Sequence, residues 1–280
     1  MRFGISTHLF HDHRLERAHL AQIAAAGFGE IELFATRSHL DYHDEAAVGA
    51  LSAWLSETGL TLKSVHAPIA LSMSAGQPGQ VLSNASSDNN VRQAAVREAE
   101  RALQVARQIP FDVLVVHLGT PAAKSAPGDN TRPAALRSAQ DICRLAEPLG
   151  VKVAFEVIPN ELSTPAALVA LLEVDLDAPR TGGICLDFGH AHLMGDVADA
   201  VEVAAEHVMS THIHDNRRRA DDHLAPFLGT IDWDVALMTM QKIGYEGTYL
   251  MELANTGSPA SVLEGAQRAR QRFERSLAFP

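Results

Sequence analysis

The chain has 280 residues, of which 46% are hydrophobic and 20% charged, as in an ordinary globular protein. Its 23 Lys and Arg against 34 Asp and Glu give a formal net charge of −11, which argues against a general binder of nucleic acid or anionic membrane. Two cysteines exclude a disulfide framework, and without a signal-peptide core or a long apolar run we expect a cytoplasmic protein. The 14 histidines are a surplus that composition leaves unexplained.

Short β-branched or apolar runs alternate with helical stretches along the chain. The predicted strands are Phe3–Thr7, Glu30–Phe34, Leu60–His66, Val113–Leu118, Val151–Val157, Gly183–Asp187, Val208–His214 and Thr248–Leu253. Between them lie segments with apolar residues at helical spacing, such as the one from Val91 to Ile109. Eight strands alternating with about eight helices favour a single-domain (β/α)8 barrel, or TIM barrel, over residues 1–280.

The connections between these elements are asymmetric. Helix-to-strand links are short and contain glycine, whereas three strand-to-helix links are long, namely Pro68–Asn90, Gly119–Arg132 and Asp215–Thr230. In a TIM barrel the active site lies at the carboxyl ends of the strands, where the strand-to-helix loops gather. The sequence therefore predicts a functional site at that end of the barrel.

Six consecutive predicted strands carry a histidine or a carboxylate near their carboxyl ends. These residues are His66, His117, Glu156, Asp187, His212 with His214, and Glu252. A titratable side chain within an apolar strand loses hydration energy unless it is paired or binds a metal. Imidazole and carboxylate together suit Zn, Mn, Fe or Co. One such residue alone would be explained by a hydrogen bond or an ion pair. Such residues at the same end of six consecutive strands indicate a divalent-metal site.

Other polar residues have two interpretations each. Asp221 and His223 could hold one ion together, but a solvated acidic turn would be preferred without the other motifs. Glu32 is either an active-site residue or part of an ion pair inside the barrel. His8, near the end of the first strand, is interpreted as a loop or helix-start residue.

Several segments resemble the xylose-isomerase-like barrel superfamily, which contains sugar isomerases and epimerases and also the endonuclease IV family of apurinic-site nucleases. They are VHAP (65–68), VVHLG (115–119), FEVIPN (155–160), CLDFGHAHLMGD (185–196), HIHDN (212–216), DDHLAPFLGTIDW (221–233) and GYEGTYLMEL (244–253). Each piece alone is weak, but the combination is specific and extends over nearly the whole chain. The resemblance again implies a TIM barrel.

The resemblance also implies metal ligands at numbered positions. In the sugar isomerases and epimerases one divalent ion is held by four residues, which match Glu156, Asp187, Glu252 and a histidine of the seventh strand. His212 fits that motif better than His214. In the nuclease family further ligands build a multi-metal cluster, and these match His66, His117, His190, Asp221 and His223. Since every position holds a suitable residue, we expect one divalent ion, with up to three able to bind.

The activity that the resemblance implies is isomerisation or epimerisation of a sugar, polyol or related small hydroxy-carbonyl compound through an enediolate. Glu156 and Glu252 are the predicted base and acid, and His190 is predicted to orient the substrate or hold a second ion. His214 and Trp233 are predicted to contact the substrate, although a core tryptophan at the start of a helix explains Trp233 equally well. Dehydration or carbon–carbon cleavage would be a close variant.

The alternative is a multi-metal phosphodiester hydrolase resembling endonuclease IV. The loop Pro68–Asn90 contains no Lys or Arg and the only basic cluster is Arg217–Arg219, so the chain is poorly equipped to bind a phosphate backbone. A turn that many members build from Pro-Gly-Glu-Gly begins here with Pro226 and has Leu228 in place of the glutamate. We therefore expect a small-molecule substrate rather than nucleic acid or membrane, with homo-oligomerisation left open.

Overall fold

Eight parallel strands form a closed barrel in the computed structural model, which describes residues 1–280 except 75–76, 177–180, 256 and 279–280. In their order around the barrel they are β1 (Arg2–Ser6), β2 (Glu30–Phe34), β3 (Thr61–His66), β6 (Val113–Val116), β7 (Lys152–Glu156), β8 (Gly182–Asp187), β9 (Val208–Ile213) and β10 (Thr248–Met251). All the predicted strands are present, with ends displaced by at most two residues. The expectation of a TIM barrel is confirmed.

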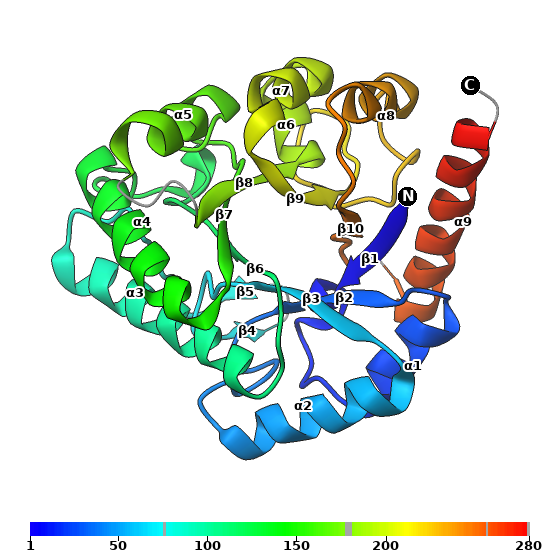
Figure 1. The fold of residues 1–280 in the computed structure, drawn as a ribbon, viewed down its shortest axis with the longest axis horizontal. Coiled ribbons are helices and arrows are strands. Elements are labelled where there is room, and N and C mark those ends of the chain that lie inside the picture. Colours follow the sequence, from blue (N-terminus) through cyan, green and yellow to red (C-terminus); the bar gives the residue numbers. More distant parts are fainter. Residues whose placement is uncertain (75–76, 177–180, 256, 279–280) are drawn as a thin grey trace.

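Helices surround the ring of strands, as Figure 1 shows. They are α1 (Arg17–Ala25), α2 (Glu45–Thr58), α3 (Asn89–Leu103), α4 (Arg132–Ala146), α5 (Pro165–Ala170), α6 (Phe188–Met194), α7 (Val197–Ala204), α8 (Trp233–Lys242) and α9 (Pro259–Ala278). Shorter helical turns are η1 (Thr7–Phe10), η2 (Gln104–Arg107), η3 (Ala122–Lys124), η4 (Glu147–Leu149), η5 (Leu171–Asp175) and η6 (Ala205–His207). Several helices begin at an aspartate whose carboxylate accepts a backbone hydrogen bond, as Asp88 does before α3.

The main core is one cluster of buried apolar residues contributed by both strands and helices. Side chains alternate along a strand, and in β2 this places Ile31 and Leu33 in that cluster while Glu32 hydrogen-bonds to Ser64 and His212 of other strands. The alternation thus explains how a fully buried carboxylate comes to stand between two core residues. It also supplies polar side chains to the barrel interior without interrupting the core.

Two long loops acquire structure of their own. Pro68–Asn90 contains a short hairpin of β4 (Met73–Ser74) and β5 (Gln77–Pro78), which the sequence did not predict. Asp215–Thr230 folds back so that Asp215 pairs with Leu224 in an antiparallel bridge. This bridge closes the segment between residues 215 and 224, which contains Asp221 and His223.

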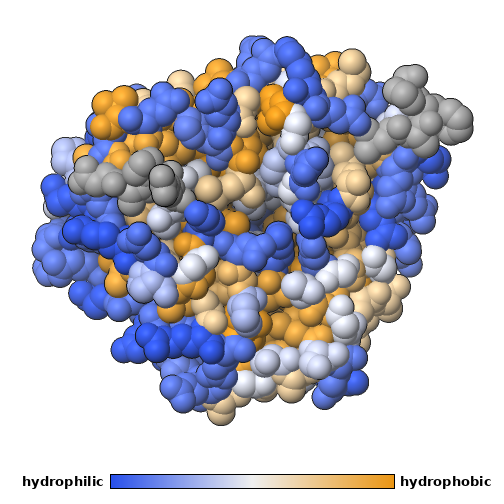
Figure 2. Space-filling model, in the orientation of Figure 1, coloured by the Kyte–Doolittle hydropathy of each residue, from blue (hydrophilic) through white to orange (hydrophobic). Residues whose placement is uncertain are grey.

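The face of the molecule drawn in Figure 2 has a mixed surface. On the face drawn in Figure 2, hydrophilic side chains cover much of the periphery and hydrophobic side chains show between them. Within the described ranges, no helix is both long enough and apolar enough to cross a membrane.

Candidate metal centre

The residues predicted at the strand ends meet at one end of the barrel. In the part of the chain that the structure describes, three groups of side chains bring potential ligand atoms within 4.8 Å of one another. The first ligand group is His66, His117 and Glu156, the second is Glu156, Asp187, His212 and Glu252, and the third is His190, His214, Asp221 and His223. Glu156 belongs to the first two groups, so these two adjoin each other. Every predicted metal ligand lies in one of the groups, and His214 joins them.

The second ligand group is buried and centred on one imidazole nitrogen. His212 Nδ1 lies 3.4 Å from Glu156 Oε1, 3.8 Å from an Asp187 oxygen and 3.5 Å from a Glu252 oxygen. Two ligands bound about 2.1 Å from one tetrahedral ion are themselves about 3.4 Å apart. Neither His212 Nδ1 nor Glu156 Oε1 has a hydrogen-bond partner, although both atoms are buried. A shared divalent cation would satisfy both atoms, so these residues fit a metal.

Glu32 sets the orientation of His212. The Glu32 carboxylate lies 3.2 Å from His212 Nε2 and accepts a 2.8 Å hydrogen bond from the Ser64 hydroxyl. Because the carboxylate can only accept, Nε2 carries the proton and the lone pair of Nδ1 faces the second ligand group. Burial raises the pKa of Glu32, but the neighbouring His212 outweighs burial and lowers the pKa below its ordinary value. Glu32 thus forms an ion pair inside the barrel, and its partner His212 belongs to the second ligand group.

The first ligand group converges on the other oxygen of Glu156. His66 Nε2 and His117 Nε2 lie 3.1 Å and 3.0 Å from Glu156 Oε2. Burial lowers the pKa of His66, but the hydrogen bond and charge of Glu156 outweigh burial and raise it to about 9. A proton on His66 therefore occupies the position that a cation would take between the imidazoles and the carboxylate.

The third ligand group surrounds Asp221. One Asp221 oxygen lies 3.1 Å from His190 Nε2 and 3.2 Å from His223 Nε2. His214 Nε2 lies 3.0 Å from an oxygen of Asp187, and its ring stacks on His223 with 3.9 Å between centroids. Burial raises the pKa of Asp221, but the charges of His223 and then His190 outweigh it and hold the pKa far below its ordinary value. Asp221 and His223 thus belong to a cluster of potential ligands, in which Asp221 is also exposed to solvent.

Backbone carbonyls fix the orientation of three histidines. The Nδ1 atoms of His66, His190 and His223 lie 2.8 Å, 3.0 Å and 2.9 Å from the carbonyl oxygens of Ala67, Val157 and Glu252. A carbonyl only accepts, so Nδ1 donates and Nε2 is left facing the carboxylates. Metal-binding imidazoles are commonly held in this way by their second nitrogen.

One histidine beside the centre was missed as a site residue. His8, in η1, stacks on His223 with 5.1 Å between ring centroids, although it belongs to none of the ligand groups. Burial and then the charge of His223 hold the pKa of His8 well below its ordinary value. No motif marked His8, because its position depends on the pairing of β1 with β10 and on the loop that carries His223.

Trp233 does not join the ligand groups. It is 2% exposed, and its ring packs against Phe188 and Phe273. Its indole nitrogen donates a 2.9 Å hydrogen bond to Asp215, the residue that follows the HIH sequence. The structure therefore places Trp233 in the core, as the interpretation as a core tryptophan expected, and not against the metal centre.

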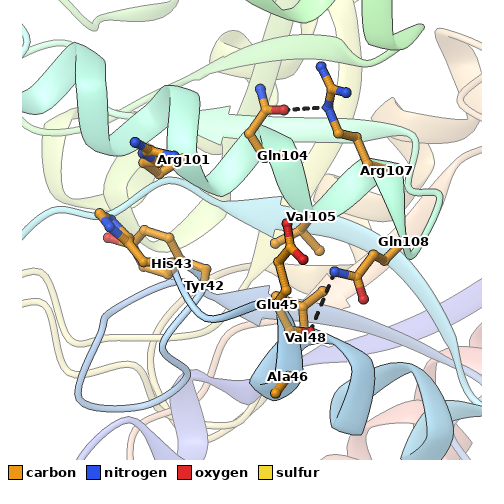
Figure 3. A pocket seen from close by; sticks show the side chains of 10 residues that line it. All are labelled: Tyr42, His43, Glu45, Ala46, Val48, Arg101, Gln104, Val105, Arg107 and Gln108. Atoms are coloured by element: carbon orange, nitrogen blue, oxygen red, sulfur yellow. Dashed lines mark hydrogen bonds between the residues drawn. The ribbon is translucent and has the colours of Figure 1, made fainter.

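A cavity of about 750 Å³ lies away from the barrel mouth, between α2 and the end of α3 with η2. Figure 3 shows Tyr42 and His43 on one side of it and Gln104 and Arg107 on the other. None of the residues described as lining it belongs to a ligand group. The chemistry of the described residues is thus concentrated at the strand ends and not in this cavity.

A family model described as xylose isomerase-like TIM barrel matches residues 20–275. The chain belongs to the xylose isomerase-like TIM barrel family. The resemblance inferred from the sequence motifs is confirmed. An uncharacterised protein of Methanocaldococcus jannaschii is 27% identical over 263 residues, which cover 91% of this chain and 84% of that protein. An inosose isomerase of Bacillus licheniformis is 27% identical over 121 residues, which cover 40% of this chain and 44% of the isomerase.

Solved structures of this family share the fold. A D-tagatose 3-epimerase-like protein superposes with a TM-score of 0.79 at 24% identity, covering 99% of this chain and 97% of its own. An IolI protein solved with a bound zinc atom gives a TM-score of 0.76 at 16% identity, covering 97% of both chains. These two proteins therefore share the barrel fold of this chain.

Proposed function

We propose that this protein is a divalent-metal-dependent isomerase or epimerase of a sugar, polyol or related small hydroxy-carbonyl compound. The observation that carries the proposal is the second ligand group, in which Glu156 and Glu252 approach the same unpartnered nitrogen of His212. Two carboxylates and an imidazole around one position are the donor set of a divalent-metal site. The sugar epimerases among the structural neighbours support the same reaction class.

The site residues would bind the ion, transfer protons and orient the substrate. Glu156, Asp187, His212 and Glu252 would hold a divalent ion that polarises adjacent carbonyl and hydroxyl oxygens of the substrate and acidifies the carbon between them. Glu156 and Glu252 would remove the proton from that carbon and return one to it. His190, whose Nε2 lies 3.1 Å from an oxygen of Asp221, would orient the substrate or hold a second ion. Both glutamates are buried, so the proton would move in a site shielded from bulk water.

A second candidate function is hydrolysis of a phosphodiester by two or three ions. The first and third ligand groups favour it, because each supplies two or more imidazoles and a carboxylate beside the second group. The net charge of −11 and the absence of Lys and Arg from residues 68–90 weigh against a nucleic-acid substrate. We therefore propose the hydrolase only as the second candidate.

The test of the proposed function is proton exchange at carbon. Protein purified without chelator and loaded with Mn²⁺, Co²⁺ or Zn²⁺ is incubated in D₂O with a panel of ketoses and inososes, and deuterium in the sugar is measured by mass spectrometry. We expect deuterium incorporation by the wild type, loss of more than about a hundredfold in Glu156→Gln and Glu252→Gln, and no change in Glu161→Gln, an exposed glutamate nearby. Failure to exchange any sugar with any metal would count against an isomerase.

The hydrolase is tested on the same preparations. Metal content per chain and nicking of abasic DNA at low salt are measured with and without chelator. Two or three ions per chain with chelator-sensitive nicking would favour the hydrolase, whereas exchange of sugar protons without nicking would exclude it.

A further inference from the structure

The wall of the metal centre next to β1 is formed by His8, which is not a ligand in any of the three groups. His8 is the second residue of η1, and its backbone N–H donates to the Ser6 hydroxyl over 3.2 Å. Its ring stacks on His11 with 4.5 Å between centroids, and it stands edge-on to Phe34 at 4.9 Å. Together with the contact to His223, these neighbours hold the imidazole in one orientation.

His8 lies between His223 of the third ligand group and Phe34, which packs on the first group. Phe34, at the end of β2, lies 5.1 Å from the ring of His66 in the first group, and His8 itself lies 5.1 Å from His223 in the third. His223 Nδ1 in turn lies 3.7 Å from a carboxylate oxygen of Glu252 in the second group, so one residue separates His8 from that group. Phe34 is 2% exposed, so in this wall it supports His8 and does not itself reach the substrate.

The hydrogen bonds of His8 leave one ring nitrogen free. Nδ1 lies 3.2 Å from the carbonyl oxygen of Leu253, which can only accept, so Nδ1 donates. No described residue makes a hydrogen bond to His8 Nε2, and Nε2 is not among the buried unpartnered atoms, so it is open to a ligand. On the neutral ring this nitrogen is an acceptor, fixed in place by the stack on His223 and His11.

We propose that His8 is a substrate-contact residue whose Nε2 accepts a hydrogen bond from a hydroxyl group of a polyhydroxylated substrate. This inference rests on the proposed function and narrows it to substrates that present a hydroxyl donor to His8 while they are bound at the second ligand group. The unesterified oxygens of a phosphodiester only accept, so they would face an acceptor at His8. The wall therefore suits a sugar or cyclitol better than a phosphate ester.

The test measures binding of sugar and of phosphate to the metal-loaded protein by titration calorimetry. D-tagatose, D-psicose and D-fructose are the sugar probes, and dimethyl phosphate, a phosphodiester without a hydroxyl donor, is the anion probe. His8→Phe keeps a flat ring in the stack but removes the acceptor. His13→Phe is the matched control, since His13 is exposed and lies in the same segment. We expect His8→Phe to weaken sugar binding about tenfold, the effect of one net hydrogen bond, without weakening phosphate binding.

Two further measurements separate contact with substrate from support of the metal centre. Metal content should be the same in wild type, His8→Phe and His13→Phe, and loss of metal from His8→Phe alone would overturn the proposal. His8→Gln, whose amide oxygen can accept, should recover part of the sugar affinity. Equal sugar affinity in wild type and His8→Phe would also overturn the proposal and leave the isomerase intact. If the wild type binds none of the sugars and exchanges none of the panel, the proposed function and this inference fail together.

Discussion

At the scale of single residues, the metal centre depends on which nitrogen each histidine turns towards the carboxylates. His212 presents Nδ1 because Glu32 occupies its Nε2, whereas His66 and His223 present Nε2 because carbonyl oxygens occupy their Nδ1. The imidazole of His212 therefore faces the carboxylates through Nδ1, whereas those of His66 and His223 face them through Nε2. A carboxylate or carbonyl behind each of these three rings removes the choice of tautomer before any ion binds.

Replacing Glu32 by glutamine tests this orientation. The amide can still accept from His212, but it loses the charge that strengthens the hydrogen bond, so we expect metal affinity to fall about 10- to 100-fold. Affinity is measured by competition with a fluorescent chelator. Glu30→Gln, on the same strand, is the control, and equal affinity in both variants would contradict the role of Glu32.

His39 gives the stability of the fold a pH dependence. Its ring is fully buried, with Nδ1 2.7 Å from the His13 carbonyl, and burial lowers its pKa from 6.5 to about 4. The unfolded chain takes up this proton as pH falls through 6.5, whereas the folded chain does so only near pH 4. Stability from neutral His39 is thus present above pH 6.5 and lost as pH falls towards 4, by about 3 kcal/mol.

The His39→Gln variant isolates this contribution from that of the other histidines. The free energy of unfolding in urea is measured for wild type and variant between pH 7 and pH 4. We expect the advantage of the wild type to shrink by about 3 kcal/mol over this range. A constant difference across the range would show that His39 does not titrate as described.

At the scale of elements, the junctions after β8 and β9 position the site. Asp187 ends β8, accepts a 2.7 Å hydrogen bond from the backbone of His190 at the start of α6, and turns its other oxygen to His214. Asp215, after β9, accepts from the backbone of Phe227 and Ile231 and from the indole of Trp233. The carboxylate of each aspartate thus fixes the backbone that follows its strand, and that backbone carries neighbouring ligands.

Replacing Asp215 by asparagine tests the second junction. One carboxylate oxygen becomes an NH₂ group that faces N–H donors, so at least two hydrogen bonds are lost in a buried position. We expect about 3 kcal/mol of destabilisation, together with weaker binding of any ion held by Asp221 and His223. Thermal unfolding and metal titration measure both effects, with Asp222→Asn in the same loop as the control. An unchanged unfolding midpoint would contradict the role of Asp215.

At the scale of the whole molecule, the ligand groups draw on strands that lie far apart in the sequence. Glu156 on β7 meets His66 from β3 and His212 from β9, and Glu252 follows β10. Ions bound here would tie together most of the barrel in the folded state only. Binding of an ion should therefore stabilise the entire fold rather than one loop.

Removal of metal measures this coupling. At a metal concentration about a hundred times the dissociation constant, binding adds about 2.7 kcal/mol to the free energy of unfolding, so chelator should lower the unfolding temperature by several degrees. Glu156→Gln should show a much smaller difference between metal and chelator, since it removes a ligand of two groups. An identical unfolding temperature with and without chelator in the wild type would mean that no ion binds the folded state.

The barrel fold and the positions of its polar residues at the strand ends could be predicted from the amino-acid sequence. Apolar runs of strand length and glycine-marked turns locate all eight strands, because hydrophobic periodicity reflects burial directly. It also marked the residues that became the three ligand groups. The role of Asp221 and His223, in the loop Asp215–Thr230, stayed ambiguous. A turn with these two residues has the same composition whether they face solvent or belong to a cluster of ligands.

The sharing of Glu156 between two ligand groups and the orientation of the histidines depend on contacts between distant strands. The stagger of the barrel brings Glu156 into two groups, puts Glu32 behind His212, sets His8 against His223 and leaves Trp233 in the core. Such contacts join residues far apart in the sequence, and Glu32 and His212, for example, are 180 positions apart. The physical reason is that local pattern records which face of a strand is buried, whereas the partner on that face depends on the register between strands.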